Sequence, residues 1–286
     1  MSRIAYVNGR YLPHRQACVH IEDRGFQFAD GVYEVIAVKG RGFVDETPHL
    51  KRLHRSLDEL RIAPPMSDAA LTAVMRETVR RNRVVDGILY IQITRGAAPR
   101  DFPFPPGVRP SLIMTARTQR PIDPKILERG VRVVTLPDIR WARPDIKSVA
   151  LLPNALGKQH AREAGAYEAW QVDRDGNVTE GTSSNAWIVT AKSEIVTRHA
   201  DHAILNGVTR LGVLQVARDA GLTLVERPFS VTEAKAAREA FLTSTTNFVV
   251  PIVRIDDATV GEGRPGEFVS RLRALYTDFA LKGVVR

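Results

Sequence analysis

The stretch "RWARPDIKSVALLPNALGKQHA", residues 140–161, places one lysine, Lys147, between an isoleucine and a serine just before an apolar run. Lysine side chains are normally solvated, because burying their charge is costly. The chain has only 8 lysines among its 41 basic residues, so a lysine with apolar neighbours is unusual here. We interpret Lys147 as a residue that holds a cofactor covalently. Such a cofactor needs further groups elsewhere in the chain.

Length and composition predict an ordinary globular protein. The 286 residues suggest about two domains, and 44% hydrophobic residues are enough to build sizeable cores. The single cysteine, Cys18, cannot form an internal disulfide, and we expect it to be a small buried hydrophobic residue. The first residues show no apolar run of signal-peptide length, and no stretch approaches a membrane span. A cytoplasmic protein without membrane contact is therefore expected.

The formal net charge is +9, which raises the question of nucleic acid. The arginines that supply most of this charge are scattered, and the densest cluster, "RETVRRNR" at 76–83, reads as the solvated face of a helix. Nucleic-acid binding is therefore not expected, although a basic nucleic-acid-binding module is the alternative from a different class. No metal site is expected either.

Helix-like and strand-like segments alternate, which predicts a mixed α/β fold in two domains. We expect an N-terminal α/β domain at 1–118, an interdomain linker at 119–125 and a C-terminal cofactor-binding domain at 126–286. One helix is expected to start with Thr47 as N-cap, and a second to run from Ser67 to about Asn82. Two strands flank the loop "GAAPRDFPFPPGVRP", residues 96–110, which holds five prolines and two glycines.

Two stretches are suited to binding a phosphate group. "LNGVTR" at 205–210 opens a helix, and free N–H groups with a hydroxyl at a helix N-terminus favour an anion, here at Val208 and Thr209. "TSTTN" at 243–247 offers further hydroxyls in a turn after a strand. Arg52, on the first long helix, adds a guanidinium group, which suits phosphate oxygens.

An acid completes the set. Glu180 lies in "VTEGTSSN", residues 178–185, where a strand enters a turn of small residues. A lysine, an acid and a phosphate site together are what pyridoxal 5′-phosphate requires, because the lysine forms a Schiff base and the acid keeps the pyridine nitrogen protonated. Each feature alone is more often an ordinary surface lysine, turn residue or helix cap.

The order and spacing of these features resemble a known family. The chain resembles the fold-type IV pyridoxal-phosphate enzymes, and most closely the D-amino-acid (D-alanine) transaminases. The matching stretches run through nearly the whole chain and are "EDRGFQFADGVYEV", "HLKRL", "DIKSVALLPNALGKQHA", "EAWQVDRDGNVTEGTSSN", "LNGVTR" and "FLTSTTNFVVPI". The pair "DIKS" and "TEGTSSN" is the most specific of them. The resemblance implies a small N-terminal α/β domain and a larger C-terminal pseudo-barrel domain.

The resemblance also implies roles for individual residues. Lys147 and Glu180 match the catalytic lysine and the acid at the pyridine nitrogen. The residues that match the rest of the cofactor site are Arg52, Val208, Thr209 and Thr245 at the phosphate and Leu205 at the ring face. Those on the substrate side are Tyr33, Arg100, Phe102 and Thr246. Because Arg100 matches an arginine contributed by the neighbouring subunit, a homodimer acting on amino acids and 2-oxo acids is expected.

One position departs from the family pattern. The D-alanine enzymes place a histidine two residues after the arginine, which completes a trap for the substrate carboxylate, whereas this chain has Phe102. The substrate therefore stays open between D-amino acids, such as D-alanine and D-glutamate, and three alternatives. These are a branched-chain transaminase, an (R)-amine transaminase and a lyase of the aminodeoxychorismate type. Arg140 and Arg143 lie in the matching run without an assigned role.

Overall fold

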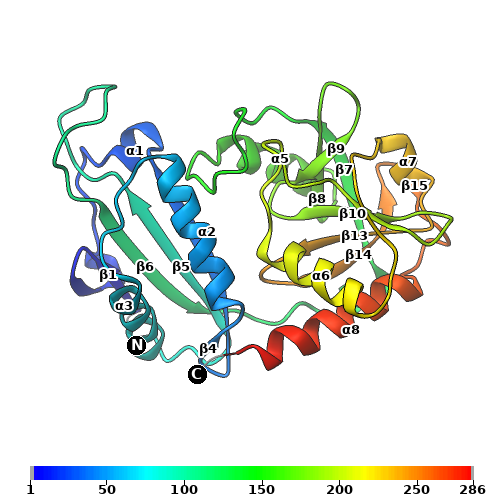
Figure 1. Ribbon diagram of the computed structural model, residues 1–286, viewed down its shortest axis with the longest axis horizontal. Helices are drawn as coiled ribbons and strands as arrows, with labels where there is room; N and C mark the ends of the chain where they lie inside the picture. The colour runs from blue at the N-terminus through cyan, green and yellow to red at the C-terminus, as the bar shows by residue number, and fades with distance from the viewer. Residues whose placement is uncertain (1–2, 285–286) are drawn as a thin grey trace. The chain divides into compact units, whose positions relative to one another are not determined.

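The structure is a computed structural model that describes residues 3–284. The chain forms two compact units. Unit 1 contains residues up to Arg120, the short segment Ile146–Ala150 and the last described residues from Gly283. Unit 2 contains Pro121–Asp145 and Leu151–Lys282. Each unit has its own sheet (Figure 1), and each has its own hydrophobic core.

Unit 1 is built on a six-stranded sheet in the order β2-β1-β6-β5-β3-β4, in which all neighbours are antiparallel. Its strands are β1 (Ile4–Val7), β2 (Arg10–Pro13), β3 (Gly31–Lys39), β4 (Gly42–Phe43), β5 (Gly87–Thr94) and β6 (Ser111–Thr118). Its helices are the 3-10 turn η1 (His14–Gln16), α1 (Arg24–Phe28), α2 (Glu46–Glu59) and α3 (Asp68–Arg81).

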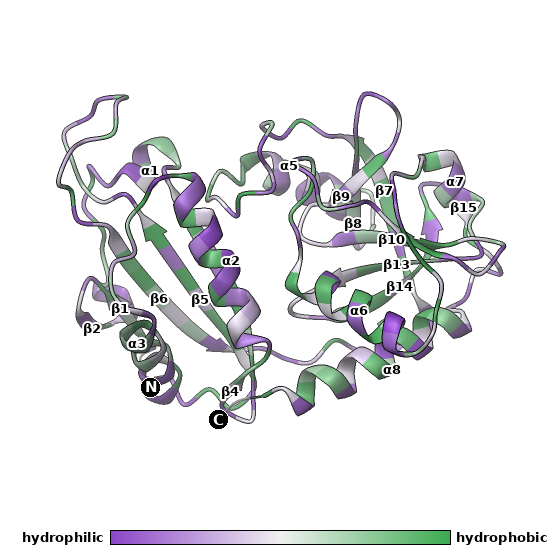
Figure 2. Cartoon of the chain, in the orientation of Figure 1, coloured by the Kyte–Doolittle hydropathy of each residue, from purple (hydrophilic) through white to green (hydrophobic). Residues whose placement is uncertain are grey.

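The two faces of this sheet differ. Val32 and Ile36 of β3 pack with Leu53 of α2 and Met75 of α3 in one core cluster, so the two helices cover this face. Because side chains alternate along a strand, Tyr33, which directly follows Val32, points to the opposite face. The sheet strands carry much green, hydrophobic colour in Figure 2, whereas α2 also carries several purple residues.

The segment Ile146–Ala150 joins unit 1 by backbone pairing. The N–H of Tyr33 donates to the carbonyl of Lys147 at 3.0 Å, and the N–H of Val149 donates to the carbonyl of Gly31 at 3.0 Å. Ser148 forms a β-bridge with Val32. These bonds fix the backbone at Lys147 against the start of β3.

Unit 2 has a nine-stranded sheet in the order β12-β11-β10-β13-β14-β7-β8-β9, with β15 beside β14. The sheet is mixed, since β7 is parallel to β8 and β14 while most other neighbours are antiparallel. The strands are β7 (Val131–Pro137), β8 (Glu168–Val172), β9 (Val178–Gly181), β10 (Asn185–Val189), β11 (Ile195–Thr197), β12 (Leu224–Glu226), β13 (Glu239–Ser244), β14 (Phe248–Ile255) and β15 (Ala258–Thr259). The helices are α4 (Pro124–Arg129), α5 (Leu152–Glu163), α6 (Val208–Asp219), α7 (Val231–Lys235) and α8 (Glu267–Lys282).

The predicted fold class is confirmed: the molecule combines α and β elements, and the sheet of unit 2 forms the half-barrel of the two-domain fold. The domain limits at 118 and 126 stay a prediction; α4 already begins at Pro124, within the expected linker. Within residues 3–284, no helix has the length and apolar character that crossing a membrane requires.

Two local expectations need correction and one is confirmed. The helix α2 begins at Glu46 after Asp45, not after Thr47, because the left-handed backbone of Asp45 (φ 52°) ends the preceding turn. Cys18 is exposed rather than buried, since its segment between η1 and α1 has no regular structure that would direct it into a core. The second helix is confirmed, with Ser67 accepting a hydrogen bond from the N–H of Ala70 as N-cap.

Candidate active site

Lys147 lies in unit 1 with its amine on an aromatic ring. Its Nζ is 4.3 Å from the ring centre of Tyr33, and its backbone N–H donates to the Oγ of Ser56 at 3.2 Å. Among residues 3–284, this Nζ has no hydrogen-bond or ion-pair partner. An amine that is held in place but not tied to a carboxylate is available for reaction with a carbonyl group.

Tyr33 belongs to an aromatic and polar group on the face of the sheet away from α2 and α3. Its ring stacks on that of Tyr90, with centroids 5.8 Å apart, and the Tyr90 hydroxyl donates to the Oε1 of Gln92 at 2.7 Å. Burial raises the pKa of Tyr90 to about 12, so this hydroxyl stays protonated at neutral pH. Sequence reasoning missed Tyr90 and Gln92, although the alternation in "ILYIQIT" could have placed both on the face of Tyr33.

Arg52 is buried in an ion pair, not solvated. Its Nε donates to one oxygen of Glu34 at 2.7 Å and its terminal nitrogen to the other at 2.9 Å. The Nδ1 of His49 lies 2.7 Å from the same carboxylate. Burial by itself raises the pKa of Glu34, but the charge of Arg52 and the bond to His49 hold it far below its usual range. The guanidinium therefore has a fixed orientation.

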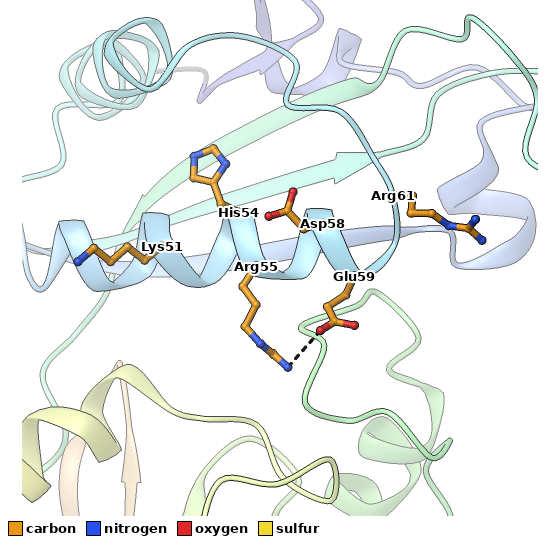
Figure 3. A pocket seen from close by; sticks show the side chains of 6 residues that line it. All are labelled: Lys51, His54, Arg55, Asp58, Glu59 and Arg61. Carbon is orange, nitrogen blue, oxygen red and sulfur yellow. Dashed lines mark ion pairs between the residues drawn. The ribbon is translucent and has the colours of Figure 1, made fainter.

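The outer side of α2 has a different character. An open cavity of about 630 Å³ is lined by Lys51, His54, Arg55, Asp58, Glu59 and Arg61, and Figure 3 shows the first five along α2 and Arg61 past its end. Arg55, one turn from Arg52, is 44% exposed and lies 3.7 Å from Glu59. This mixed, solvated face makes Arg55 a suitable comparison for Arg52.

Glu180, in unit 2, is a buried acid with fixed partners. Its Oε1 accepts hydrogen bonds from Arg140 and, at 3.1 Å, from the N–H of Leu205. Its Oε2 accepts from the Nδ2 of Asn185 at 2.9 Å. The side chain of Glu180 is only 6% exposed, and its ion pair with Arg140 offsets part of the cost of burying the carboxylate.

Arg140, which the sequence left without a role, joins Glu180 to a second acid. Its terminal nitrogen lies 2.7 Å from Asp138, and Asp138 also accepts a hydrogen bond from the hydroxyl of Thr179 at 2.8 Å. Burial opposes the charge of both groups, but the two acids raise the pKa of Arg140 and Arg140 lowers that of Asp138. Asp138, Arg140 and Thr179 also line a cavity of about 460 Å³.

The acid is tied to the start of α6. Asn185 donates to the carbonyl of Leu205 at 2.9 Å as well as to Glu180. Gly207 is the N-cap of α6, and a Cβ there would lie 2.0 Å from the Oδ1 of Asn185, so this position requires a glycine. The first turn of α6, with Val208 and Thr209 buried, contains no acidic residue. Such a helix end suits an anion.

The threonines expected at the phosphate and substrate lie in a turn of unit 2. Thr245 and Thr246 connect β13 to β14; Thr245 is half-buried and Thr246 is exposed. In the adjoining strand, Thr243 accepts a hydrogen bond from the indole of Trp187 at 2.9 Å. The turn therefore follows a strand whose end is fixed by a buried hydrogen bond.

Arg100 and Phe102 lie in the Pro-rich loop of unit 1, and their ring contacts are with Phe28. The guanidinium carbon of Arg100 is 4.6 Å from the Phe28 ring centre, and the rings of Phe28 and Phe102 are 5.5 Å apart. Phe102 is 78% exposed. A ring this exposed in the single chain is available to a ligand or a partner.

The chemistry of these groups fits pyridoxal 5′-phosphate. Lys147 offers an amine, Glu180 an acid that is paired with a buried arginine, and Arg52 and the N-terminus of α6 offer positive charge. These are the groups that an aldehyde, a pyridine nitrogen and a phosphate require. The sequence named all four as candidates, but it gave no sign of the groups that fix Arg52, Glu180 and Arg140, namely Glu34, His49, Asp138 and Asn185.

Comparisons with known proteins agree with this chemistry. The model of the family described as amino-transferase class IV matches residues 31–255. The chain is 42% identical over 276 residues to a D-alanine aminotransferase of Bacillus licheniformis, covering 96% of each chain. A branched-chain amino acid aminotransferase of Escherichia coli shares the fold, with a TM-score of 0.89 at 23% identity over 98% of this chain and 95% of that one. A 4-amino-4-deoxychorismate lyase of Pseudomonas aeruginosa has a TM-score of 0.82 at 25% identity, over 96% of this chain and 98% of that one.

Proposed function

The chain belongs to the class IV aminotransferases, a family of fold type IV, and we propose that it transfers amino groups between D-amino acids and 2-oxo acids with pyridoxal 5′-phosphate as cofactor. The observation that carries this proposal is the buried acid Glu180, held next to the start of α6 by Arg140 and Asn185. The likeness to D-alanine aminotransferase over nearly the whole chain favours D-amino acids. The branched-chain enzyme and the lyase are more distant in sequence.

The residues of the chain have distinct tasks in this proposal. When bound, the cofactor supplies an aldehyde for amines and an electron-withdrawing ring that stabilises negative charge at the substrate α-carbon. Lys147 would hold the cofactor and, once substrate has displaced its amine, move the proton at the α-carbon. Glu180 would keep a proton on the pyridine nitrogen, because its own charge is maintained by Arg140.

The remaining residues would bind and orient. Arg52 and the N–H groups at Val208 and Thr209 would bind the phosphate, with the hydroxyl of Thr245, while Leu205 would pack against the ring. On the substrate side we place four residues, namely Tyr33, Arg100, Phe102 and Thr246. Among these, Arg100 would bind the carboxylate, since a guanidinium can hold it with two parallel hydrogen bonds.

We also propose that two copies of the chain form a homodimer in which Arg100 serves the neighbouring copy. Ile21, Phe26 and Phe102 of unit 1 are each at least 75% exposed. Large apolar side chains that remain exposed in a single chain are typical of an interface. A cytoplasmic location stays a prediction.

The experiment is a half-reaction screen. The loaded enzyme is mixed singly with D-amino acids, L-amino acids and (R)- and (S)-amines, and the absorption of the bound cofactor is followed as it converts to its amino form. Conversion by D-alanine or D-glutamate, completed by return of the amino group to a 2-oxo acid, supports the proposal. Conversion by branched-chain L-amino acids alone would replace it, and turnover without any 2-oxo acid would indicate a lyase.

The presence of Phe102 supports a second candidate function, that of an (R)-amine transaminase. A phenyl ring offers no hydrogen bond and makes its end of the pocket more apolar than a histidine would. We expect Phe102→His to improve D-alanine relative to an (R)-arylalkyl amine, and Arg100→Ala to reduce activity on D-alanine selectively. Equal responses of both substrates would show that this loop does not recognise the carboxylate.

A further inference from the structure

The loop between β5 and β6 is held at its base by main-chain hydrogen bonds. Residues 99–110 contain no helix or strand, and they form the loop that extends beyond α1 in Figure 1. At its base the N–H of Arg24 donates to the backbone carbonyl of Gly96 at 2.9 Å, and the N–H of Ala98 donates to the backbone carbonyl of Glu22 at 3.2 Å. These bonds fix where the loop leaves the sheet but not the conformation around Arg100.

A buried side chain reaches the part of the loop next to Arg100. The guanidinium of Arg24, only 3% exposed, donates to the carbonyl of Asp101 at 2.6 Å and to that of Phe102 at 3.2 Å. It also lies 4.7 Å from the ring centre of Phe28, the same ring that Arg100 contacts at 4.6 Å. Arg24 therefore touches both the backbone after Arg100 and the ring on which Arg100 rests.

Arg24 is itself held by an acid that it shares with a second arginine. Its Nε lies 2.8 Å from Asp30, and Arg95 lies 2.7 Å from the same carboxylate. Arg95 donates to the carbonyls of Leu60 and Arg61 just after α2, and its guanidinium carbon is 3.6 Å from the ring centre of Phe104. Asp30 thus fixes two arginines that contact the loop: Arg24 at the carbonyls of Asp101 and Phe102, and Arg95 at the ring of Phe104.

We propose that Arg24 is a positioning residue for substrate recognition. It fixes the conformation of the Pro-rich loop, and this conformation places Arg100 and Phe102 where they contact the carboxylate end of the substrate. The proposal rests on the proposed role of Arg100. A planar guanidinium that donates to two consecutive carbonyls restricts the backbone between them, and a lysine cannot reproduce this fork. Replacing Arg24 by Met leaves Asp30 paired with Arg95, so no buried charge is abandoned.

The first test measures loop order without reference to activity. The loaded enzyme is digested with trypsin under native conditions, and cleavage after Arg100 is timed in wild type, Arg24→Met and Arg24→Lys. We expect roughly tenfold faster cleavage at this bond in both variants, because a charge-assisted hydrogen bond contributes about that factor. The matched control is Arg132→Met in unit 2, since Arg132 donates to two carbonyls, of Asp256 and Ala164, that also belong to unit 2. An unchanged rate after Arg100 overturns the proposal, as does equal acceleration at every tryptic site.

The second test asks whether loop order affects recognition. In Arg24→Met we expect the KM for D-alanine to rise roughly tenfold while kcat and cofactor affinity change little. In an Arg100→Ala background the same substitution should leave KM unchanged, because Arg24 acts through Arg100. Should KM respond to Arg100→Ala but not to Arg24→Met, the positioning role is overturned. If the KM for D-alanine is unchanged in Arg100→Ala, the proposed role of Arg100 is wrong. The role of Arg24 in recognition is then wrong as well, whatever the trypsin result.

Discussion

The carboxylate of Glu180 and the guanidinium of Arg140 form an ion pair inside unit 2, with side chains only 6% and 5% exposed. Desolvation makes such a pair costly, and its hydrogen bonds must offset that cost. Here Asn185 and the N–H of Leu205 donate further hydrogen bonds to the carboxylate of Glu180, and Asp138 forms a second ion pair with Arg140. In the proposed function, this network supports the carboxylate that would face the protonated pyridine nitrogen of the cofactor.

Removing Arg140 should therefore weaken both the fold and the reaction. We expect Arg140→Met to lower the free energy of unfolding by about 3–5 kcal/mol, because it leaves buried carboxylates uncompensated. Turnover should fall as well, since Glu180 would then favour its protonated form. The control is Arg264→Met in the same unit, because Arg264 and its partner Glu262 are both largely exposed, at 77% and 75%, so no buried carboxylate loses its partner. Urea unfolding and turnover assays check this, and equal losses in both variants would contradict it.

Glu180→Gln separates the charge of the acid from its shape. The amide keeps the size of the side chain, so cofactor binding and attachment to Lys147 should persist. Turnover should fall by roughly 10²–10³-fold, the range found for positioned electrostatic groups. The absorption spectrum of the bound cofactor and the single-turnover rate are the readouts. A rate near that of wild type would remove Glu180 from the reaction.

Arg52 and Arg55 lie one turn apart on α2 and should differ in effect. We expect Arg52→Ala to weaken cofactor retention strongly while turnover at saturating cofactor changes less, since phosphate contacts position the cofactor. Arg55→Ala, which removes an exposed partner of Glu59, should leave retention unchanged. Equilibrium dialysis of the cofactor compares the two. Arg52→Ala also leaves the buried carboxylate of Glu34 without its arginine partner, which lowers stability. The double variant Arg52→Ala/Glu34→Gln should therefore recover stability but still bind the cofactor weakly.

The Glu34 cluster predicts a specific acid dependence of stability. The pKa of Glu34 is far below its ordinary value in the folded state, so its contribution is present above about pH 4.3 and is lost as pH falls below that. The unfolding free energy of wild type should therefore exceed that of Glu34→Gln most at neutral pH, and the gap should narrow between roughly pH 4.5 and pH 3. Urea titrations at several pH values measure this gap. A gap that stays constant with pH would rule out the ionised carboxylate as its source.

Much of the fold could be predicted from local patterns. Strand alternation and helix periodicity indicated two α/β domains, and Ser67 caps α3 as its position suggested. The start of α2 was misplaced because the left-handed backbone at Asp45, which ends a turn, leaves no clear signal in the sequence. Cys18 was expected to be buried because cysteines usually are, yet its segment has no regular structure.

The site was predicted less completely than the fold. Lys147, Glu180 and Arg52 were identified by their neighbours in sequence and by family likeness, and their roles remain predictions. Their supporting partners come from distant segments: Glu34 precedes Arg52 by 18 residues, and Arg140 precedes Glu180 by 40. A buried charge whose partner lies on a distant segment carries no local signal, so only the structure could reveal these pairs.

Attachment of the cofactor to Lys147 is tested by reduction with borohydride followed by peptide mapping. The loaded enzyme is reduced, digested and searched for the modified lysine, with Lys147→Ala as the matched variant. We expect the label on Lys147 alone, and a Lys147→Ala protein that still binds the cofactor but is not labelled. A label on Lys158 or any other lysine in the wild-type enzyme would contradict it.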